Sequence, residues 1–233
     1  MLRIVCHILV FSCILFLLAC NTKHGKGDTY NYSEEDIKQQ IADSLFTQLK
    51  HQTSLYTDWQ KTYQQKEPFF SLDSFNYRSE YNNDFIYTVA KLNKDYYKKY
   101  GAFFVYNADS TKFIDAFSYY LVITIDKRGH LWRGGTEADQ EVAVIDIKAQ
   151  KRYRVFFCGT PCFVAKTVWI GDDKIALMGL TTEEDEDDFI PTIWLINLKK
   201  ASTIEYSYSK HIRDITPEML LDELVKNKGI KSK

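Results

Sequence analysis

The sequence predicts an α+β fold made mostly of antiparallel strands, with a long helix near the N-terminus and a short one near the C-terminus. Three observations predict it. Apolar residues recur every three or four positions over residues 33–65, short strands and turns alternate from residue 102 to residue 208, and part of that region repeats at an offset of 51 residues. A helical period followed by a series of strands is typical of this class. Aromatic residues make up 15% of the chain against only 4 prolines, which favours half-buried strands.

The predicted long helix begins at Ser33. A serine there is a suitable N-cap, and the acidic residues that follow it stabilise a helix N-terminus. We expect the apolar stripe to pack against the sheet, and a helix that binds a partner is the alternative interpretation. Pro68 lies beyond its end. The stripe, with one polar break, consists of Ile37, Ile41, Leu45, Leu49, Gln52, Tyr56, Trp59 and Tyr63.

Residues 83–100 allow two interpretations. A helix fits the spacing of Phe85, Val89 and Tyr96, with Gly101 as its C-terminal cap. A tyrosine-rich hairpin around residues 93–95 also fits. We favour the helix, so that residues 32–101 are predicted to form a mainly helical segment.

A β region is predicted over residues 102–210, followed by a C-terminal helix and tail over residues 211–233. Thr216-Pro217-Glu218 is a typical start for that helix, which carries Met219, Leu220, Leu224 and Val225. The predicted strands are Phe103–Asn107, Phe113–Phe117, Tyr119–Asp126, Val142–Ile147, Tyr153–Phe157, Val164–Ile170, Ile175–Gly179, Thr192–Leu198 and Thr203–Tyr208.

Two stretches of the β region repeat. Residues 142–153 align with residues 193–204, and a hairpin lies upstream of each, over residues 104–115 and 168–177. This order of strands and turns resembles the blades of β-propellers. Known propellers have four or more blades, whereas this chain has room for two or three. The resemblance therefore implies an open antiparallel meander of two blade-like repeats and not a closed propeller.

The N-terminal segment has the features of a secretory signal peptide. It begins Met1-Leu2-Arg3 and is then almost wholly apolar up to Cys20. The 16 residues between Arg3 and Cys20 are fewer than the roughly 20 that a membrane-spanning helix needs. Leu17-Leu18-Ala19-Cys20 resembles the lipobox of bacterial lipoproteins.

The lipoprotein resemblance implies cleavage after residue 19 and acylation of Cys20, so that the lipid holds the mature chain at the bilayer without a membrane span. Residues 20–31 are polar beyond the cysteine and are predicted to form a flexible tether. Some bacteria use aspartate after the cysteine to retain lipoproteins in the inner membrane. Asn21 stands at that position here, which by the same resemblance favours the outer membrane of the cell envelope.

Two cysteines remain once Cys6 and Cys13 leave with the signal and Cys20 carries lipid. Cys158 and Cys162 flank Gly159-Thr160-Pro161 between two apolar runs. Because exported proteins meet an oxidising environment, we predict a disulfide across a hairpin loop. A redox-active pair and two free thiols are the alternatives.

Charge and motifs exclude several functions. With 30 basic and 31 acidic residues, the chain has no basic excess of the kind that binds nucleic acid. Gly-x-Ser-x-Gly and His-Glu-x-x-His are absent, and His51, His130 and His211 are widely spaced. The acidic run at residues 183–188 lacks the spacing of a calcium loop, so we predict no metal and no cofactor.

Two loops are predicted to carry binding because they occupy corresponding positions in the two repeats. We expect a non-catalytic module, either one that binds an envelope protein or a structural one. The alternative is binding of carbohydrate or peptidoglycan, with or without hydrolysis, through Trp132, Trp169 and Trp194. The candidate residues of the loops are Gly134, Glu137, Asp139, Glu183, Asp185 and Asp187.

Overall fold

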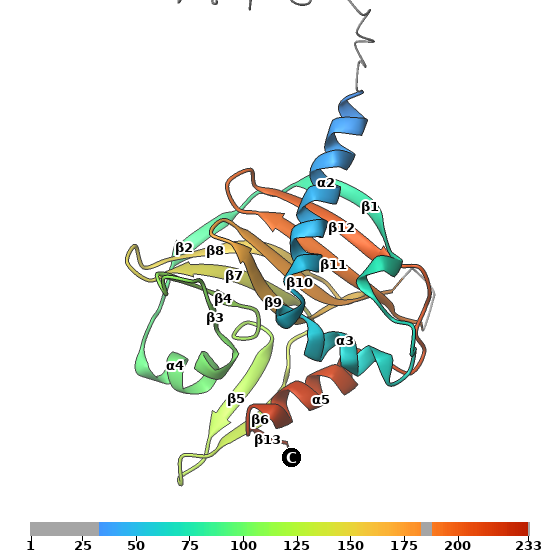
Figure 1. Cartoon of the computed structure of the whole chain (residues 1–233). Coiled ribbons are helices and arrows are strands. Elements are labelled where there is room, and N and C mark those ends of the chain that lie inside the picture. The colour runs from blue at the N-terminus through green and yellow to red at the C-terminus, as the bar shows by residue number, and fades with distance from the viewer. Residues whose placement is uncertain (1–32, 183–187, 233) are drawn as a thin grey trace, which may run out of the picture. The chain divides into compact units, whose positions relative to one another are not determined.

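The computed structural model describes residues 33–182 and 188–232, and contacts divide the chain into residues 1–37 and 38–233. The second unit has an α+β fold of mostly antiparallel, open sheets (Figure 1). The fold class predicted from the sequence is therefore confirmed. The α-helices of the described residues are α2 (Glu34–His51), α3 (Thr57–Gln64), α4 (Lys94–Tyr100) and α5 (Pro217–Asn227).

The first sheet has the strand order β1-β12-β11-β10-β9, and all its neighbouring strands are antiparallel. Helices α2 and α3 cover its outer face, where Phe46 of α2 stacks on Tyr206 of β12 with ring centres 4.1 Å apart. The strands are β1 (Phe75–Asn82), β9 (Cys162–Gly171), β10 (Lys174–Thr181), β11 (Ile190–Asn197) and β12 (Ser202–Tyr208).

The second sheet has the order β2-β8-β7-β4-β3 and is also antiparallel throughout. Its strands are β2 (Ile86–Val89), β3 (Val105–Tyr106), β4 (Lys112–Asp115), β7 (Gln140–Asp146) and β8 (Lys151–Cys158). A small third sheet has the strand order β13-β6-β5. Its strands β5 (Leu121–Ile125) and β6 (Leu131–Thr136) lie between β4 and β7 in the chain, and β13 (Lys231–Ser232), which follows α5, pairs in parallel with β6.

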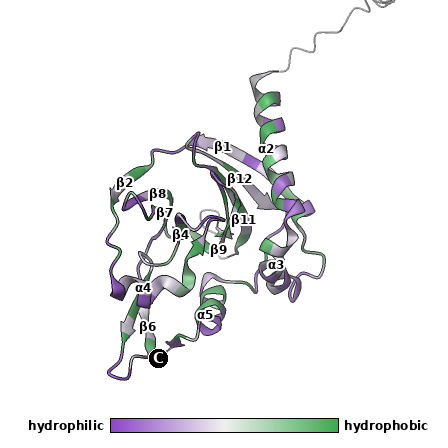
Figure 2. Ribbon diagram, turned by 60° about the vertical axis from the view of Figure 1, so that its left-hand side comes forward, coloured by the Kyte–Doolittle hydropathy of each residue, from purple (hydrophilic) through white to green (hydrophobic). Residues whose placement is uncertain are grey.

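The main core lies between the first and second sheets. Figure 2 shows their strands arranged around a common interior. Phe156 of β8 meets Trp194 of β11 there, with ring centres 5.0 Å apart. The amide of the buried Gln140 joins β7 to β9: its nitrogen donates to the Val164 carbonyl at 2.9 Å and its oxygen accepts from the Val164 N–H at 2.7 Å. Such a pair replaces backbone pairing where two strands of different sheets meet.

The two sheets correspond strand by strand. In each, four strands form a meander, and an N-terminal strand, β1 or β2, adds beside the last of them. Strands β8 and β12 begin at residues 151 and 202, an offset of 51. The turns before them also match, since Gln150 and Ala201 both have positive φ, at 49° and 50°. Each turn also accepts a hydrogen bond from the segment that carries β1 and β2. The Ala90 N–H donates to the Gln150 carbonyl, and the Asn83 N–H donates to the Ala201 carbonyl.

The predicted helix over residues 33–65 is broken in the structure. Ser33 does cap α2, with its hydroxyl accepting from the Asp36 N–H at 3.1 Å. The helix ends at His51, because Gln52 leaves the helical conformation (φ −104°, ψ 54°). The Tyr56 hydroxyl then donates to the Lys50 carbonyl at 3.0 Å, which satisfies one of the carbonyls left open at the helix end. The apolar spacing resumes after the break, and its one polar member, Gln52, is the residue at which the helix is interrupted.

Residues 83–100 are neither the favoured helix nor the hairpin. Residues 86–89 form strand β2, and only residues 94–100 form helix α4, whose N-cap is Asn93. The Asn93 side chain accepts from the Tyr96 N–H at 2.9 Å and starts the helix there. Residues 32–101 thus also supply strands β1 and β2, which the prediction of a mainly helical segment omitted.

Candidate functional site

The structure describes three of the six loop residues predicted to bind: Gly134, Glu137 and Asp139. Cys20, Glu183, Asp185 and Asp187 lie outside the described residues. Glu137 and Asp139 lie in the connection between β6 and β7, as expected for a loop.

Gly134 belongs to strand β6, and its placement in a loop was wrong. A Cβ at Gly134 would lie 3.3 Å from the Val122 carbonyl oxygen, next to a register shift in the β5–β6 pair. Glycine permits this close approach of the two strands at the irregularity. The glycine-rich sequence was therefore mistaken for a loop.

The predicted disulfide between Cys158 and Cys162 is confirmed. It joins the end of β8 to the start of β9, with the two Cα atoms 5.3 Å apart. A Cβ at Gly159, inside the turn, would lie 3.9 Å from Oδ1 of Asp139. On the other side, the Thr182 N–H donates to the Pro161 carbonyl at 2.8 Å. The disulfide turn therefore lies between the β6–β7 loop and the start of the β10–β11 loop.

The three tryptophans proposed for sugar stacking do not form a common groove. Trp194 is buried between the sheets, and the Trp169 indole donates to the Val105 carbonyl at 2.8 Å. Trp132 lies in β6 under the Lys231 ammonium, which is 5.3 Å from its ring centre. Carbohydrate binding needs exposed aromatic faces beside suitable polar groups. The positions of these side chains give that alternative no support.

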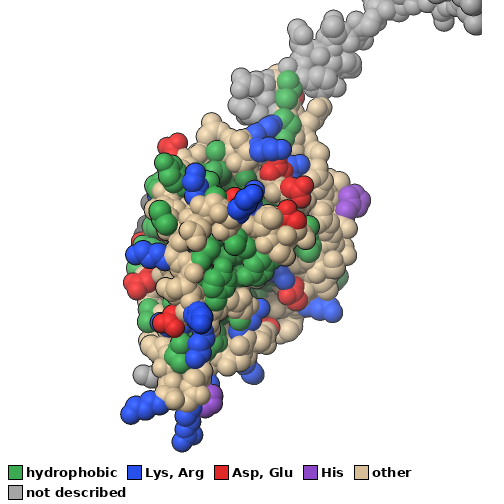
Figure 3. All heavy atoms as spheres, turned by 90° about the vertical axis from the view of Figure 1, so that its left-hand side faces the viewer, with side chains coloured by type: hydrophobic (Ala, Val, Ile, Leu, Met, Phe, Trp, Pro, Cys, Tyr) green, Lys and Arg blue, Asp and Glu red, His purple; other side chains and the backbone are tan. Residues whose placement is uncertain are grey.

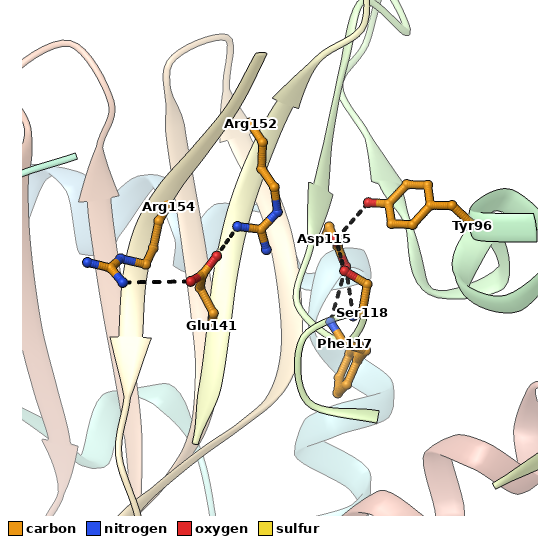
Figure 4. A network of polar contacts seen from close by, with 7 residues as sticks. All are labelled: Tyr96, Asp115, Phe117, Ser118, Glu141, Arg152 and Arg154. Carbon is orange, nitrogen blue, oxygen red and sulfur yellow. Dashed lines mark hydrogen bonds and ion pairs between the residues drawn. The ribbon is translucent and has the colours of Figure 1, made fainter. Parts of the chain in front are cut away.

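The outer face of the second sheet carries an unusual set of buried charges (Figure 4). Asp115 in β4 is fully buried and accepts from the Tyr96 hydroxyl of α4 at 2.7 Å, from the Ser118 N–H at 3.0 Å and from the Ser118 hydroxyl. Burial and the neighbouring Asp115 carboxylate raise the pKa of Tyr96. Tyr96 therefore stays a neutral hydrogen-bond donor. The Asp115 carboxylate is occupied by these donors and is not free to bind a substrate.

Glu141 of β7 forms the second part of this network. Its buried carboxylate bonds to the Arg152 guanidinium, and its other oxygen lies 3.8 Å from Arg154. The Arg154 guanidinium also lies over the ring of the exposed Phe157, 5.5 Å from its centre. A buried carboxylate that is paired in this way is held in place and is not available as a base. The network supports a surface for binding and not a catalytic pair.

Two cavities lie outside the main core. One, of about 290 Å³, lies among α3, α5 and β9, and the ion pair between Lys166 and Asp58 lies at its wall, with both carboxylate oxygens 2.6 Å from the ammonium. Burial by itself raises the pKa of the Asp58 carboxyl. The hydrogen bond and the positive charge of Lys166 outweigh this effect, so that the pKa of Asp58 is lowered. The other, of about 200 Å³, is lined by Val89, Ala90, Lys91, Leu92, Tyr96, Ile145 and Arg152.

Strand β2, at the free end of the second sheet, is the most exposed apolar strand among the described residues. Val89 is 77% exposed, Tyr87 67% and Ile86 48%, and Phe157 of the neighbouring β8 is 48% exposed. Figure 3 shows hydrophobic side chains gathered at the centre of this side of the molecule, with charged side chains around them. Exposed apolar patches with a polar rim mark interaction sites. Sequence reasoning missed this strand, although Ile-Tyr-Thr-Val is a strand-forming run.

No group of His, Cys, Asp or Glu in the described ranges could hold a metal ion, and no helix there is long and apolar enough to cross a membrane. No protein family, curated protein or solved structure matches the chain. The function must therefore be inferred from the site itself.

Proposed function

We propose that the protein is a lipid-anchored protein of the bacterial cell envelope whose folded unit is a non-catalytic module that binds another protein. The exposed apolar strand β2, with Phe157 beside it, is the observation that carries the binding part of the proposal. The carboxylates of this face, Asp115 and Glu141, are held by hydrogen bonds and ion pairs, which favours binding over catalysis. The anchor rests on Leu17–Cys20, and Asn21 supports the outer membrane.

We further infer that the two sheets are two copies of one blade-like unit that remain open. Their identical strand order supports this inference, together with the shared offset of 51 between β8 and β12. The side chains that cap the two turns occupy equivalent positions: Asp146 accepts from the Ala149 N–H at 2.8 Å and Asn197 from the Lys200 N–H at 3.0 Å. Two copies of one unit would have two equivalent edge strands, here β1 and β2, and each can acquire a different role.

The anchor is tested by replacing the proposed lipid attachment site. Cys20→Ala should abolish incorporation of labelled palmitate, since the thioether cannot form. Cys13→Ala is the matched control, because it removes a cysteine of the apolar segment and leaves Cys20 in place. The lipoprotein assignment is wrong if Cys20→Ala is labelled as strongly as the wild type. It is also wrong if neither the wild type nor Cys13→Ala is labelled.

Protein binding is tested by photo-crosslinking in intact cells. A photoreactive residue at Phe157 should give a discrete adduct with one other protein, and the same residue at Phe69 should not. Phe69 is 85% exposed but precedes β1, away from the second sheet, and so controls for exposure alone. Adducts at neither position, combined with co-sedimentation of the protein with purified peptidoglycan, would instead support the carbohydrate alternative.

A further inference from the structure

Strand β2 lacks the protection that the equivalent strand of the other sheet carries. Strand β1 holds Arg78 and Glu80 and has a register shift near its centre. Charges and bulges are the usual means of preventing an edge strand from pairing with another chain. Strand β2 has neither a charge nor a bulge within its four residues, and its pairing with β8 is regular. Of the two equivalent edge strands, β2 is therefore the one that can pair with a strand of another chain.

The free edge of β2 presents backbone groups in a defined pattern. The Ala90 N–H donates to the Gln150 carbonyl at 2.8 Å, in register with the β2–β8 ladder. Because hydrogen-bonded and non-bonded pairs alternate in an antiparallel ladder, Thr88 and Ile86 also direct their backbone groups to β8. Tyr87 and Val89 consequently direct their N–H and C=O groups away from the sheet. A strand laid along this edge can bond to both residues.

The charges around this edge indicate the chemistry of the added strand. The residues of β8 paired with Val89, Thr88 and Ile86 are Lys151, Arg152 and Arg154. Glu141 compensates the two arginines only in part. Lys91, two residues after the strand, and Asp84, two residues before it, offset each other, so Lys151, Arg152 and Arg154 against Glu141 leave a basic excess. The edge is therefore basic and favours an acidic partner. Two copies of this chain joined through β2 would bring the same basic residues together, which disfavours a homodimer.

A recess beside the edge offers a place for a side chain. The cavity of about 200 Å³ begins at Val89 and is lined by apolar groups, with Lys91 and Arg152 among its polar ones. An extended strand directs alternate side chains to opposite faces, so one side chain of an added strand, near Val89, can face this recess. Backbone pairing with pockets for alternate side chains is the general mode of strand addition.

We propose that an extended, acidic segment of another envelope protein adds to the free edge of β2 as a further strand of the second sheet. This inference rests on the proposed function and specifies its surface and its partner. The backbone of Tyr87 and Val89 supplies the bonds, and the basic residues of β8 select the acidic segment.

The test uses the lipidated protein in detergent and a fluorescein-labelled octapeptide of alternating glutamate and valine. Fluorescence anisotropy should show saturable binding of this peptide. The same peptide with lysine in place of glutamate should bind at least about tenfold more weakly, because its charges are repelled. A version methylated on alternate backbone nitrogens should also lose about tenfold or more, since each lost hydrogen bond contributes about 1 kcal/mol.

The decisive variant is Val89→Pro. Proline removes an N–H that faces away from β8, so the β2–β8 ladder is retained while the free edge is blocked. Asn82→Pro is the matched control. Asn82 is the last residue of β1 and Val89 the last of β2, and the N–H of the next residue, Asn83 or Ala90, bonds to the equivalent turn. Val89→Pro should weaken binding of the acidic peptide at least about tenfold, and Asn82→Pro should leave it unchanged, with equal melting temperatures for the two variants.

Three results would overturn the proposal: no binding of the acidic peptide, equal binding by Val89→Pro and wild type, or dimerisation of the protein that Val89→Pro abolishes. The last would make the occupant a second copy. If the Phe157 adduct described above forms while the peptide tests fail, the protein-binding function stands and only its assignment to β2 is wrong. If neither the Phe157 adduct nor peptide binding is observed, the protein-binding function and its assignment to β2 are both wrong.

Discussion

The two five-stranded sheets share a strand order but differ in what covers them. The first is enclosed on both faces, by α2 and α3 outside and by the second sheet inside, and its edge β1 carries charges and a bulge. On the outer face of the second, α4 is the one α-helix among the described residues, and its Tyr97 packs on Phe113 with ring centres 6.3 Å apart. Its outer face carries Glu141 and Arg154, and its edge β2 is apolar and exposed.

This difference is the basis for proposing that the second sheet binds a partner while the first is mainly structural. A buried charge and an open edge strand are features that reduce stability. We therefore expect the largest losses of stability from mutations in the shared interior. At the outer face of the second sheet, we expect exposed side chains such as Phe157 to affect binding with little loss of stability, whereas the buried network around Asp115 contributes to both.

The largest expected effect distinguishes the two faces of one strand, β8. Phe156→Ala should lower the free energy of unfolding by about 3–5 kcal/mol, because it leaves a cavity against Trp194. The adjacent Phe157 is 48% exposed, and Phe157→Ala should cost less than about 1 kcal/mol. Urea unfolding at neutral pH measures both. Similar losses for the two variants would show that the outer face is as firmly packed as the interior.

The next largest effect concerns the covalent link between the sheets. Replacing both Cys158 and Cys162 by serine should cost about 2 kcal/mol, because the bond closes a short loop and constrains the unfolded chain only slightly. The protein should still fold, since Gln140 also joins β7 to β9. Thermal unfolding of the double variant, compared with oxidised wild type, measures this cost, and reduced wild type should unfold like the variant. Failure of the double variant to fold would mean that the disulfide is essential to the docking of the two sheets.

The sequence predicted those parts of the fold that depend on local pattern. The nine predicted strands, the C-terminal helix and the disulfide turn all occur close to their expected positions. The helix break at Gln52 and strands β1, β2 and β6 were missed. Gln52 is the one polar residue of the stripe, and a single polar residue does not by itself indicate a helix end. Strand β2 is a strand because it pairs with β8, which lies more than 60 residues later in the chain.

The candidate site was less predictable than the fold. Asp115, Glu141 and Arg152 are scattered over the sequence and share a face only because β4, β7 and β8 are neighbours in the sheet. Gly134 attracted attention as part of a glycine-rich loop, whereas its glycine serves a close contact between two strands. Side chains that meet through strand order leave no local signal in a single sequence.

The smallest expected effect compares one tyrosine from each sheet. Tyr96 of the second donates to Asp115, whereas the buried Tyr206 hydroxyl of the first has no hydrogen-bond partner among the described residues. At pH 7, Tyr96→Phe should therefore cost about 1–2 kcal/mol and Tyr206→Phe close to nothing. Burial is the first cause of the raised pKa of both tyrosines, followed by nearby acidic groups, Asp115 for Tyr96 and Asp43 for Tyr206.

The sign of the pH dependence follows from these raised pKa values. Above about pH 10 the unfolded chain releases the tyrosine proton while the folded chain keeps it, so stability falls as pH rises. Each tyrosine of this kind contributes a slope of about 1.4 kcal/mol per pH unit, and each phenylalanine variant should lose that contribution. The stability curves of wild type and Tyr96→Phe should hence converge above pH 10, whereas Tyr206→Phe should become the more stable protein there. Parallel curves for Tyr96→Phe and wild type in urea unfolding from pH 7 to pH 11 would show that Tyr96 ionises alike in both states, and that α4 leaves it open to solvent.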